Sequence, residues 1–301
     1  MDKSDLKQSH DKISPTAKIA AYFRSLSDIP FSKEIAGAIQ AEQAARQMLG
    51  DKLPVMAKFQ APLIEARYKT INAVLKNSEP EVILEFACGL LPRGLEFMQS
   101  DIDYIGTDLP DLVSESSSIL SDIASRSGFL KEKLRFQPCN VLNKDEVNSA
   151  VSIFKGKKIA VCNEGLLMYL NMNEKAIMAE NVREVLQGSD GTWITTDIVT
   201  RDSRKDLFES LKSSQNAFVK SVFGVISSQV GRDITGNDFA NEAEAFDFYK
   251  NLGFKIEKYR FHDTDSTLST LSNASSDMTE WIDILDTILS KFEAWILTPE
   301  E

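Results

Sequence analysis

Four polar residues stand at or just after the ends of short apolar segments. They are Glu85, Asp108, Asn140 and Glu164, and successive members are 23 to 32 positions apart. Such apolar segments are typical of parallel strands covered on both faces, and parallel strands bring their carboxyl ends to one edge of a sheet. In nucleotide-binding βαβ units, the carboxylate that binds the ribose hydroxyls lies roughly 20 residues after the turn that follows the first strand. The 23 positions from Glu85 to Asp108 therefore favour a ligand that contains a nucleoside.

Each residue at this edge has a physical role in holding a nucleoside with a charged tail. Asp108 can accept both ribose hydroxyls, Gly89 lets the backbone come close, and Asn140 can pair its amide with an adenine edge. Glu164 can hold an ammonium group, and Arg67 offers a bidentate partner for a carboxylate. The candidate cofactor-binding residues are Arg67, Glu85, Ala87, Gly89, Asp108, Leu109, Asn140, Val141 and Glu164, and Tyr169 stands in the same region.

These residues also have purely structural interpretations. Asp108 and Asn140 could cap turns, since Asp and Asn side chains favour such positions. Arg67 could be a solvated residue on a helix, and Tyr169 a core aromatic whose hydroxyl reaches the surface. Their joint placement after successive strands favours the binding site over the separate alternatives.

The motifs that hold phosphate groups are missing. A dinucleotide fingerprint G-x-G-x-x-G is absent, because only Gly89 and Gly94 remain in the relevant turn, and no G-x-x-x-x-G-K-[ST] loop occurs. Adenosine without phosphates fits better. S-adenosylmethionine carries an adenine, a ribose, a carboxylate and an ammonium, which the candidate residues can match one for one.

From residue 81 onward, short apolar strands alternate with helical stretches, which is typical of a doubly wound parallel sheet. Strands are predicted at 82–86, 104–107, 134–138, 159–163, 192–198, 254–261 and 292–297. Helices are predicted at 92–98, 112–127, 144–154, 173–186, 203–230, 241–252 and 278–290. The expected fold class is α/β, with a doubly wound, mostly parallel seven-stranded sheet whose last strand is antiparallel and lies at an edge.

The N-terminal part is predicted to be helical throughout. Apolar residues recur at helical spacing over 17–26, 32–49 and 61–75, with breaks expected at Pro30, Gly50 and Pro62. We therefore expect a helical N-terminal extension and substrate lid at 1–78, and a core at 79–301 with a helical insertion at 203–230. Insertions at the carboxyl end of a strand commonly cover a binding crevice.

Composition excludes several classes of function. The chain is 43% hydrophobic and 26% charged, as soluble globular proteins are, and no apolar run approaches a membrane span. A formal charge of −11 without a basic cluster argues against nucleic acid as a partner. The polar N-terminus and three cysteines, Cys88, Cys139 and Cys162, without CxxC spacing predict a cytoplasmic protein with reduced thiols and no metal site. Two histidines leave little material for a His-dependent hydrolase.

Several segments together resemble a known family. ILEFACGLLPRG, YIGTDLPDLV, NEGLLMYL and GTWITTDIVTRD, with the leader segments ISPTAKIAAYFRSLSDIPFSKEIA and PLIEARYKTINAVL, are similar to class I S-adenosylmethionine-dependent methyltransferases of the leucine carboxyl methyltransferase type. The resemblance covers residues 13–202 and implies a Rossmann-like methyltransferase sheet. The family usually has glycine at the position of Ala87 and aspartate at that of Asn140.

The resemblance also implies roles for individual residues. Arg67 would bind the methionine carboxylate, and Glu164 would lie near the amino end of the cofactor. Asp108 with Leu109 would hold the ribose and adenine, Asn140 with Val141 would lie along the adenine, and Gly89 would contact the methionine moiety. Tyr169 would stand near the transferred methyl, and Tyr22 and Arg24 would face the substrate.

The predicted function is O-methyl transfer from S-adenosylmethionine to a carboxylate or hydroxyl of a small molecule. A carboxylate needs no base, whereas a hydroxyl does, and Glu164, Tyr169 or Asp197 are candidates for that base. Arg24 or Arg201 could orient an anionic substrate. Two alternatives remain open: a protein C-terminal carboxyl methyltransferase, and a protein that binds S-adenosylmethionine without catalysis.

Overall fold

The computed structural model describes residues 14–129, 131–213, 215–217, 220, 236–272 and 279–300. Its centre is a seven-stranded sheet in the order β3-β2-β1-β4-β5-β7-β6. The strands are β1 Val82–Phe86, β2 Asp103–Asp108, β3 Leu134–Pro138, β4 Ile159–Asn163, β5 Thr192–Thr195, β6 Phe254–Arg260 and β7 Glu293–Pro299. The seven predicted strands are thus confirmed, although β5 ends three residues earlier than predicted.

The sheet is mixed. Strands β1 to β5 pair in parallel, and β7 pairs antiparallel with both β5 and β6. The antiparallel direction of the last strand is confirmed, but its predicted place at an edge is wrong. Trp295 of β7 lies opposite Thr195 on one side and Lys258 on the other, so β6 is the edge strand. The strand order reverses between β1 and β4, where open α/β sheets bind their ligands.

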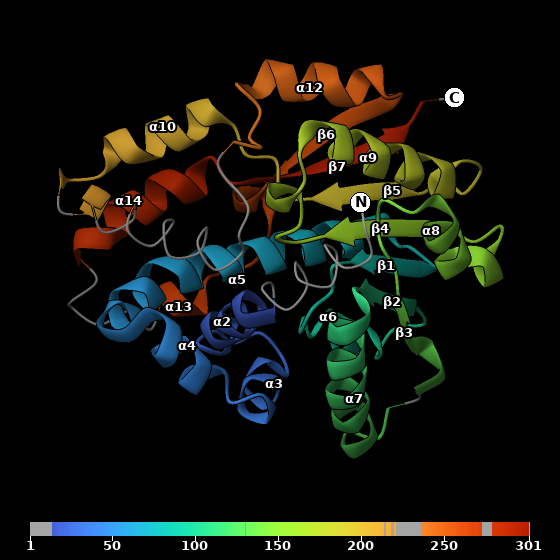
Figure 1. Cartoon of the computed structure of the whole chain (residues 1–301), viewed down its shortest axis with the longest axis horizontal. Helices are drawn as coiled ribbons and strands as arrows, with labels where there is room; N and C mark the ends of the chain where they lie inside the picture. Colours follow the sequence, from blue (N-terminus) through green and yellow to red (C-terminus); the bar gives the residue numbers. More distant parts are fainter. Residues whose placement is uncertain are drawn as a thin grey trace.

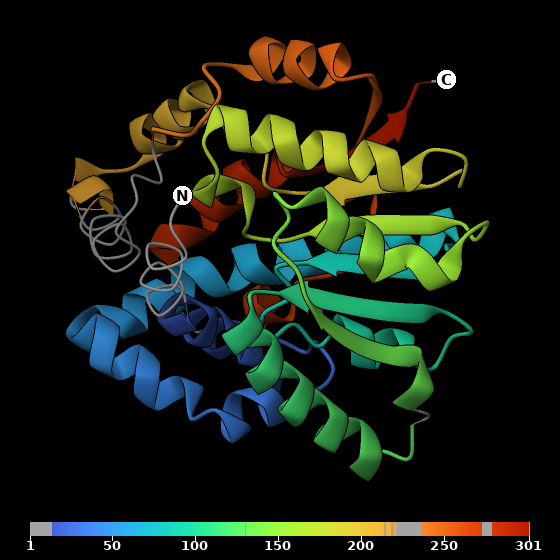
Figure 2. The same cartoon turned by 45° about the vertical axis from the view of Figure 1, so that its right-hand side comes forward.

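Alternation along the strands divides the core into two layers. Val82, Leu84 and Phe86 of β1 pack on one face, with residues of α8, α9 and α12, and Ile83 packs on the other face, with residues of α5, α6 and α7. Every residue of β1 and β4 is buried. Figures 1 and 2 show helices on both sides of the sheet. The helices around it are α6 Arg93–Phe97, α7 Pro110–Arg126, α8 Lys144–Val151, α9 Met172–Leu186, α12 Glu242–Asn251, α13 Ser269–Ser272 and α14 Thr279–Ser290.

Among the residues that the structure describes, four α-helices precede the first strand: α2 Ser14–Ser25, α3 Ser32–Ala38, α4 Ala41–Leu49 and α5 Leu53–Ser78. The predicted break at Pro62 is wrong, because α5 continues through it and loses only the hydrogen bond that a proline cannot donate. The break lies instead at Gln40, whose left-handed φ of 52° separates α3 from α4. In Figure 1, α2, α3 and α4 lie at the lower left, and α5 runs from them toward the sheet.

The helix that follows β5 is shorter than predicted. Helix α10 spans Arg201–Ser210, and Leu211 is extended (φ −83°, ψ 139°), so the predicted continuous helix over 203–230 ends early. Residues 215–217 are again helical, and the rest of the prediction from residue 221 lies outside the described residues. In the described ranges, no helix is both long enough and apolar enough to cross a membrane.

Candidate functional site

A cavity of about 1020 Å³ lies at the carboxyl ends of the parallel strands. The loops after β1, β2, β3, β4 and β5 contribute to its wall, and α2, α5, α10 and α14 cover it. This is the edge at which the sequence predicted a site. Eleven predicted residues line it: Arg24, Arg67, Ala87, Gly89, Asp108, Leu109, Asn140, Val141, Glu164, Tyr169 and Asp197.

Three predicted residues lie elsewhere. The Glu85 side chain is fully buried beside the sheet, where it binds Arg93 and Tyr104 instead of facing the cavity. Tyr22 lines a separate depression of about 950 Å³ among α2, α3 and α4. Arg201 is exposed at the start of α10, and its Nη1 atom lies 3.5 Å from the carbonyl oxygen of Asp238. The structure therefore gives none of the three a place in this cavity.

Asp108 closes β2 with its carboxylate at the cavity wall. Its oxygens accept hydrogen bonds from the backbone N–H groups of Gly89 and Leu109, both at 2.8 Å. Gly89 (φ 46°) and Ala87 (φ 51°) turn the chain sharply after β1. A left-handed conformation strains alanine but not glycine, so this turn stores strain at the cavity. Burial raises the pKa of Asp108 to about 6, although the two N–H bonds act in the opposite direction.

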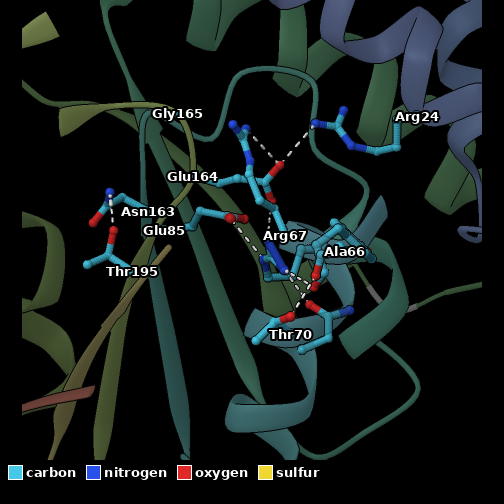
Figure 3. Close-up of polar contacts among 12 residues, drawn as sticks. Arg24, Ala66, Arg67, Thr70, Glu85, Asn163, Glu164, Gly165 and Thr195 are labelled. Carbon is cyan, nitrogen blue, oxygen red and sulfur yellow. Dashed lines mark hydrogen bonds and ion pairs between the residues drawn. The ribbon is translucent and has the colours of Figure 1, made fainter. Parts of the chain in front are cut away.

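Glu164 follows β4 and is surrounded by three guanidinium groups. One carboxylate oxygen lies 3.3 Å from Nη2 of Arg67 and 3.6 Å from Nη2 of Arg24, and the other lies 3.0 Å from Nη2 of Arg93. Figure 3 shows the dashed contacts of Glu164 to Arg24 and Arg67. Burial alone would raise the pKa of this acid, but the three arginines together lower it. Glu164 is therefore a carboxylate held in its charged form.

Arg93 is a member of this cluster that sequence reasoning missed. It is fully buried, donates from Nε to Glu85 (2.9 Å), and places its guanidinium 4.5 Å from the centre of the Tyr68 ring. It thus links β1 to β4 through two carboxylates. The sequence feature that could have indicated Arg93 is that it is the only basic residue between Glu85 and Glu96.

Some N–H donors of the arginines around Glu164 have no acceptor within this cluster. The Nε atoms of Arg24 and Arg67 are buried and have no hydrogen-bond partner among the described residues. An unpaired buried donor costs roughly 1–3 kcal/mol. Since both arginines line the cavity, an anionic group there would satisfy them.

Asp197 fixes the loop that follows β4. Its carboxylate accepts from the N–H groups of Gly165 (2.8 Å) and Leu166 (2.7 Å), and from the Asn163 side chain (2.8 Å). The N–H of Leu167 also donates to it (3.2 Å). A carboxylate engaged by four donors is a poor candidate for a base, and we interpret Asp197 as a group that positions this loop.

Tyr169 lies at the end of the same loop, in the short helix η4 Leu167–Tyr169. Its hydroxyl forms a side-chain hydrogen bond with Thr16 of α2. Burial raises the pKa of this phenol, although the Thr16 bond and the charge of Arg67 act in the opposite direction. Tyr169 therefore stays protonated at neutral pH and can donate a hydrogen bond.

Thr196, which the sequence analysis did not select, also lines the cavity. Its hydroxyl is buried without a hydrogen-bond partner in the described part of the chain, whereas the neighbouring Thr195 hydroxyl accepts from Asn163 (3.0 Å). A buried hydroxyl for which the described residues offer no hydrogen-bond partner is a candidate contact for a ligand.

The two threonines should respond oppositely to the same substitution. We expect Thr196→Val to leave the free energy of unfolding unchanged or to raise it by up to about 1 kcal/mol, because it removes an unpaired polar group. Thr195→Val should lower it by about 1–3 kcal/mol, because Asn163 loses an acceptor. Urea denaturation measures both, and equal losses would show that the Thr196 hydroxyl has a partner in the native protein.

No metal centre is found within the described residues, where no group of three His, Cys, Asp or Glu side chains could hold an ion. Cys88, Cys139 and Cys162 are buried and free, and burial raises the pKa of each thiol. Such thiols are weak nucleophiles at neutral pH.

Comparison with known proteins gives structural neighbours only. No protein-family model matches the sequence, and no curated protein sequence matches it. The chain is similar to the methyltransferase domain of bacterial CtHen1 (12% identity, 79% of this chain and 100% of that chain, TM-score 0.48). It is also similar to human N-acetylserotonin methyltransferase in complex with SAM (10% identity, 86% of this chain and 58% of that chain, TM-score 0.46). A third neighbour is a SAM-dependent methyltransferase from Anabaena variabilis (12% identity, 77% of this chain and 84% of that chain, TM-score 0.47).

Proposed function

We propose that this chain is an S-adenosylmethionine-dependent methyltransferase that acts on an oxygen of a small molecule. The observation that carries the proposal is the pair of charged features at one edge of the sheet. Asp108 stands at the end of β2, and Glu164 stands after β4 with Arg24 and Arg67 beside it. A nucleoside with an amino-acid tail has hydroxyls for the first feature and a zwitterion for the second.

The residues present fit this cofactor. The unpaired Nε atoms of Arg24 and Arg67 suit the carboxylate of the amino-acid tail, and the ionised Glu164 suits its ammonium group. We therefore assign Arg24 to the cofactor together with Arg67, instead of to the substrate. When bound, the cofactor supplies a methyl group on a sulfonium, and the chain contributes position and exclusion of water.

A carboxylate acceptor is favoured over a hydroxyl. A hydroxyl needs a base, but the three arginines lower the pKa of Glu164 and so make it a weak base, four donors engage Asp197, and Tyr169 is protonated. An ionised carboxylic acid attacks a methyl group without losing a proton. The Thr196 hydroxyl is available to donate a hydrogen bond to such an acceptor.

The acceptor is expected to have an apolar body. The cavity wall includes the apolar side chains of Phe23 of α2, Phe59 and Leu63 of α5, Ile288 of α14, and Phe292. Apolar walls with a few placed polar groups are typical of sites for small organic molecules. We further propose that residues 14–78 act as the lid of this site, through contacts such as Thr16 with Tyr169, and that the chain is related to the leucine carboxyl methyltransferase type.

The experiment uses methyl-labelled S-adenosylmethionine and a panel of apolar carboxylic acids and phenols. Transfer of label into base-labile esters supports the carboxylate, and transfer into base-stable ethers supports the hydroxyl. Label that enters only an added protein would favour a protein carboxyl methyltransferase. Binding without transfer to any acceptor would favour a non-catalytic S-adenosylmethionine-binding protein.

Cofactor affinity should depend on pH through Asp108. Only the ionised carboxylate can accept both ribose hydroxyls, and the pKa of Asp108 in the free protein is about 6. We expect the affinity for S-adenosylhomocysteine to be constant above pH 7 and to fall about tenfold per pH unit below 6. Titrations from pH 5 to 8 measure this, and the Asp108→Asn variant should show no such slope.

A further inference from the structure

We infer that Asn140 sets the nucleobase preference of the site, so that this chain accepts hypoxanthine in place of adenine far more readily than it would with an aspartate there. The inference rests on the proposed function, because it assumes that a nucleoside occupies the cavity. It concerns which base the cavity recognises, a property separate from methyl transfer itself.

Asn140 lies where the base of a nucleoside is expected. The N–H of Cys139 donates to the carbonyl oxygen of Asp108 (2.9 Å), which joins the end of β3 to the ribose-binding acid at the end of β2. Asn140 is the next residue and lines the same cavity. A ribose on Asp108 therefore directs its base toward Asn140.

The orientation of the Asn140 amide is determined by its neighbours. Its backbone N–H donates to Glu146 (2.7 Å), and its side-chain Oδ1 accepts from the N–H of Leu142 (3.0 Å). Turning the amide over would place two donors against each other, so the oxygen must face Leu142. The Nδ2 group makes no hydrogen bond within the described residues and remains available to a ligand.

An amide and a carboxylate recognise different purines. Adenine presents a 6-amino donor beside an acceptor nitrogen, whereas hypoxanthine presents a 6-oxo acceptor beside an N–H donor. A carboxylate only accepts, so it favours the amino group and repels the oxo group. The Nδ2 group of Asn140 can donate to either base, and its neutral amide places no negative charge against the 6-oxo group.

The test is a comparison of two ligands and two proteins. The probes are S-adenosylhomocysteine and S-inosylhomocysteine, which differ only at position 6 of the base, titrated calorimetrically into the wild type and Asn140→Asp. We expect Asn140→Asp to increase the preference for the adenine ligand about tenfold or more over that of the wild type. Contacts to other atoms of the base are common to both proteins and cancel in this comparison.

Asn251→Asp is the matched control, because it makes the same change of charge on an exposed side chain at the end of α12, outside the cavity. It should leave the preference unchanged. An unchanged preference in a folded Asn140→Asp would overturn the inference. Failure of the wild type to bind S-adenosylhomocysteine would instead contradict the proposed function.

Discussion

Replacing Glu164 with glutamine should lower the free energy of unfolding by about 3 kcal/mol or more. The Glu164 side chain is 1% exposed and faces three arginines. In the variant, the ion pair between Glu85 and Arg93 would be the one left among these contacts. Removing one partner of a buried ion pair typically costs 3–5 kcal/mol, because the remaining charges stay buried without compensation. Chemical denaturation at pH 7 measures the loss.

The dependence of this loss on pH is a second test of the same cluster. Because the pKa of Glu164 is lowered in the folded protein from an ordinary value of 4.5, its stabilising contribution is complete above that value. It disappears as pH falls through the lowered pKa, so the wild type and the variant should converge in acid. Glu180→Gln, on the exposed side of α9, is the control and should change stability by less than about 0.5 kcal/mol. A similar loss in both variants would contradict a central role for Glu164.

Replacing Asp108 with alanine should weaken binding of S-adenosylmethionine by about 100-fold or more. Each hydrogen bond to a charged group contributes roughly 1.5–3 kcal/mol, and the ribose would lose two of them. The loop after β1 would also lose the acceptor for the Gly89 N–H, and with it the shape of the turn. Calorimetric titration of the purified variant measures the change in dissociation constant.

The control for Asp108 is Asp111→Ala. Asp111 is exposed in the first turn of α7, and its substitution removes the same charge three positions from Asp108. It should bind the cofactor as the wild type does. Asp108→Asn keeps the shape of the side chain and separates loss of charge from loss of the turn; normal affinity in both Asp108 variants would remove the ribose assignment.

The strands of this fold could be predicted closely, because each is a short apolar run with polar or small residues at its end. The order of strands could not, since the place of β7 between β5 and β6 depends on pairing between segments far apart in the chain. The helical leader was predicted as helical but divided wrongly. Proline at position 62 removes only one hydrogen bond, and tertiary packing of α5 outweighs that loss.

The candidate site was predicted best where a residue ends or follows a strand. Asp108, Asn140 and Glu164 all line the cavity, because the topology of a parallel sheet brings those positions together. Glu85 lies one residue before the end of β1, and its side chain points to a face of the sheet, where Arg93 binds it. The spacing of residues in the sequence does not predict where the side chains of the last residues of a strand point.

Arg24 and Arg93 show why a cluster of charges is harder to predict than a strand end. Arg24 comes from α2 and Arg93 from α6, and both reach Glu164 only after the chain has folded. Nothing in their local sequence indicates which acid they contact. The resemblance to a family assigned Arg24 to the substrate, whereas the structure places it beside Arg67 on the same carboxylate.

The most direct test of this account is calorimetric titration of S-adenosylhomocysteine into the wild-type protein at pH 7.5. We expect one binding site per chain with a dissociation constant below about 100 µM. The absence of binding up to millimolar ligand, to a protein shown to be folded by circular dichroism, would contradict it.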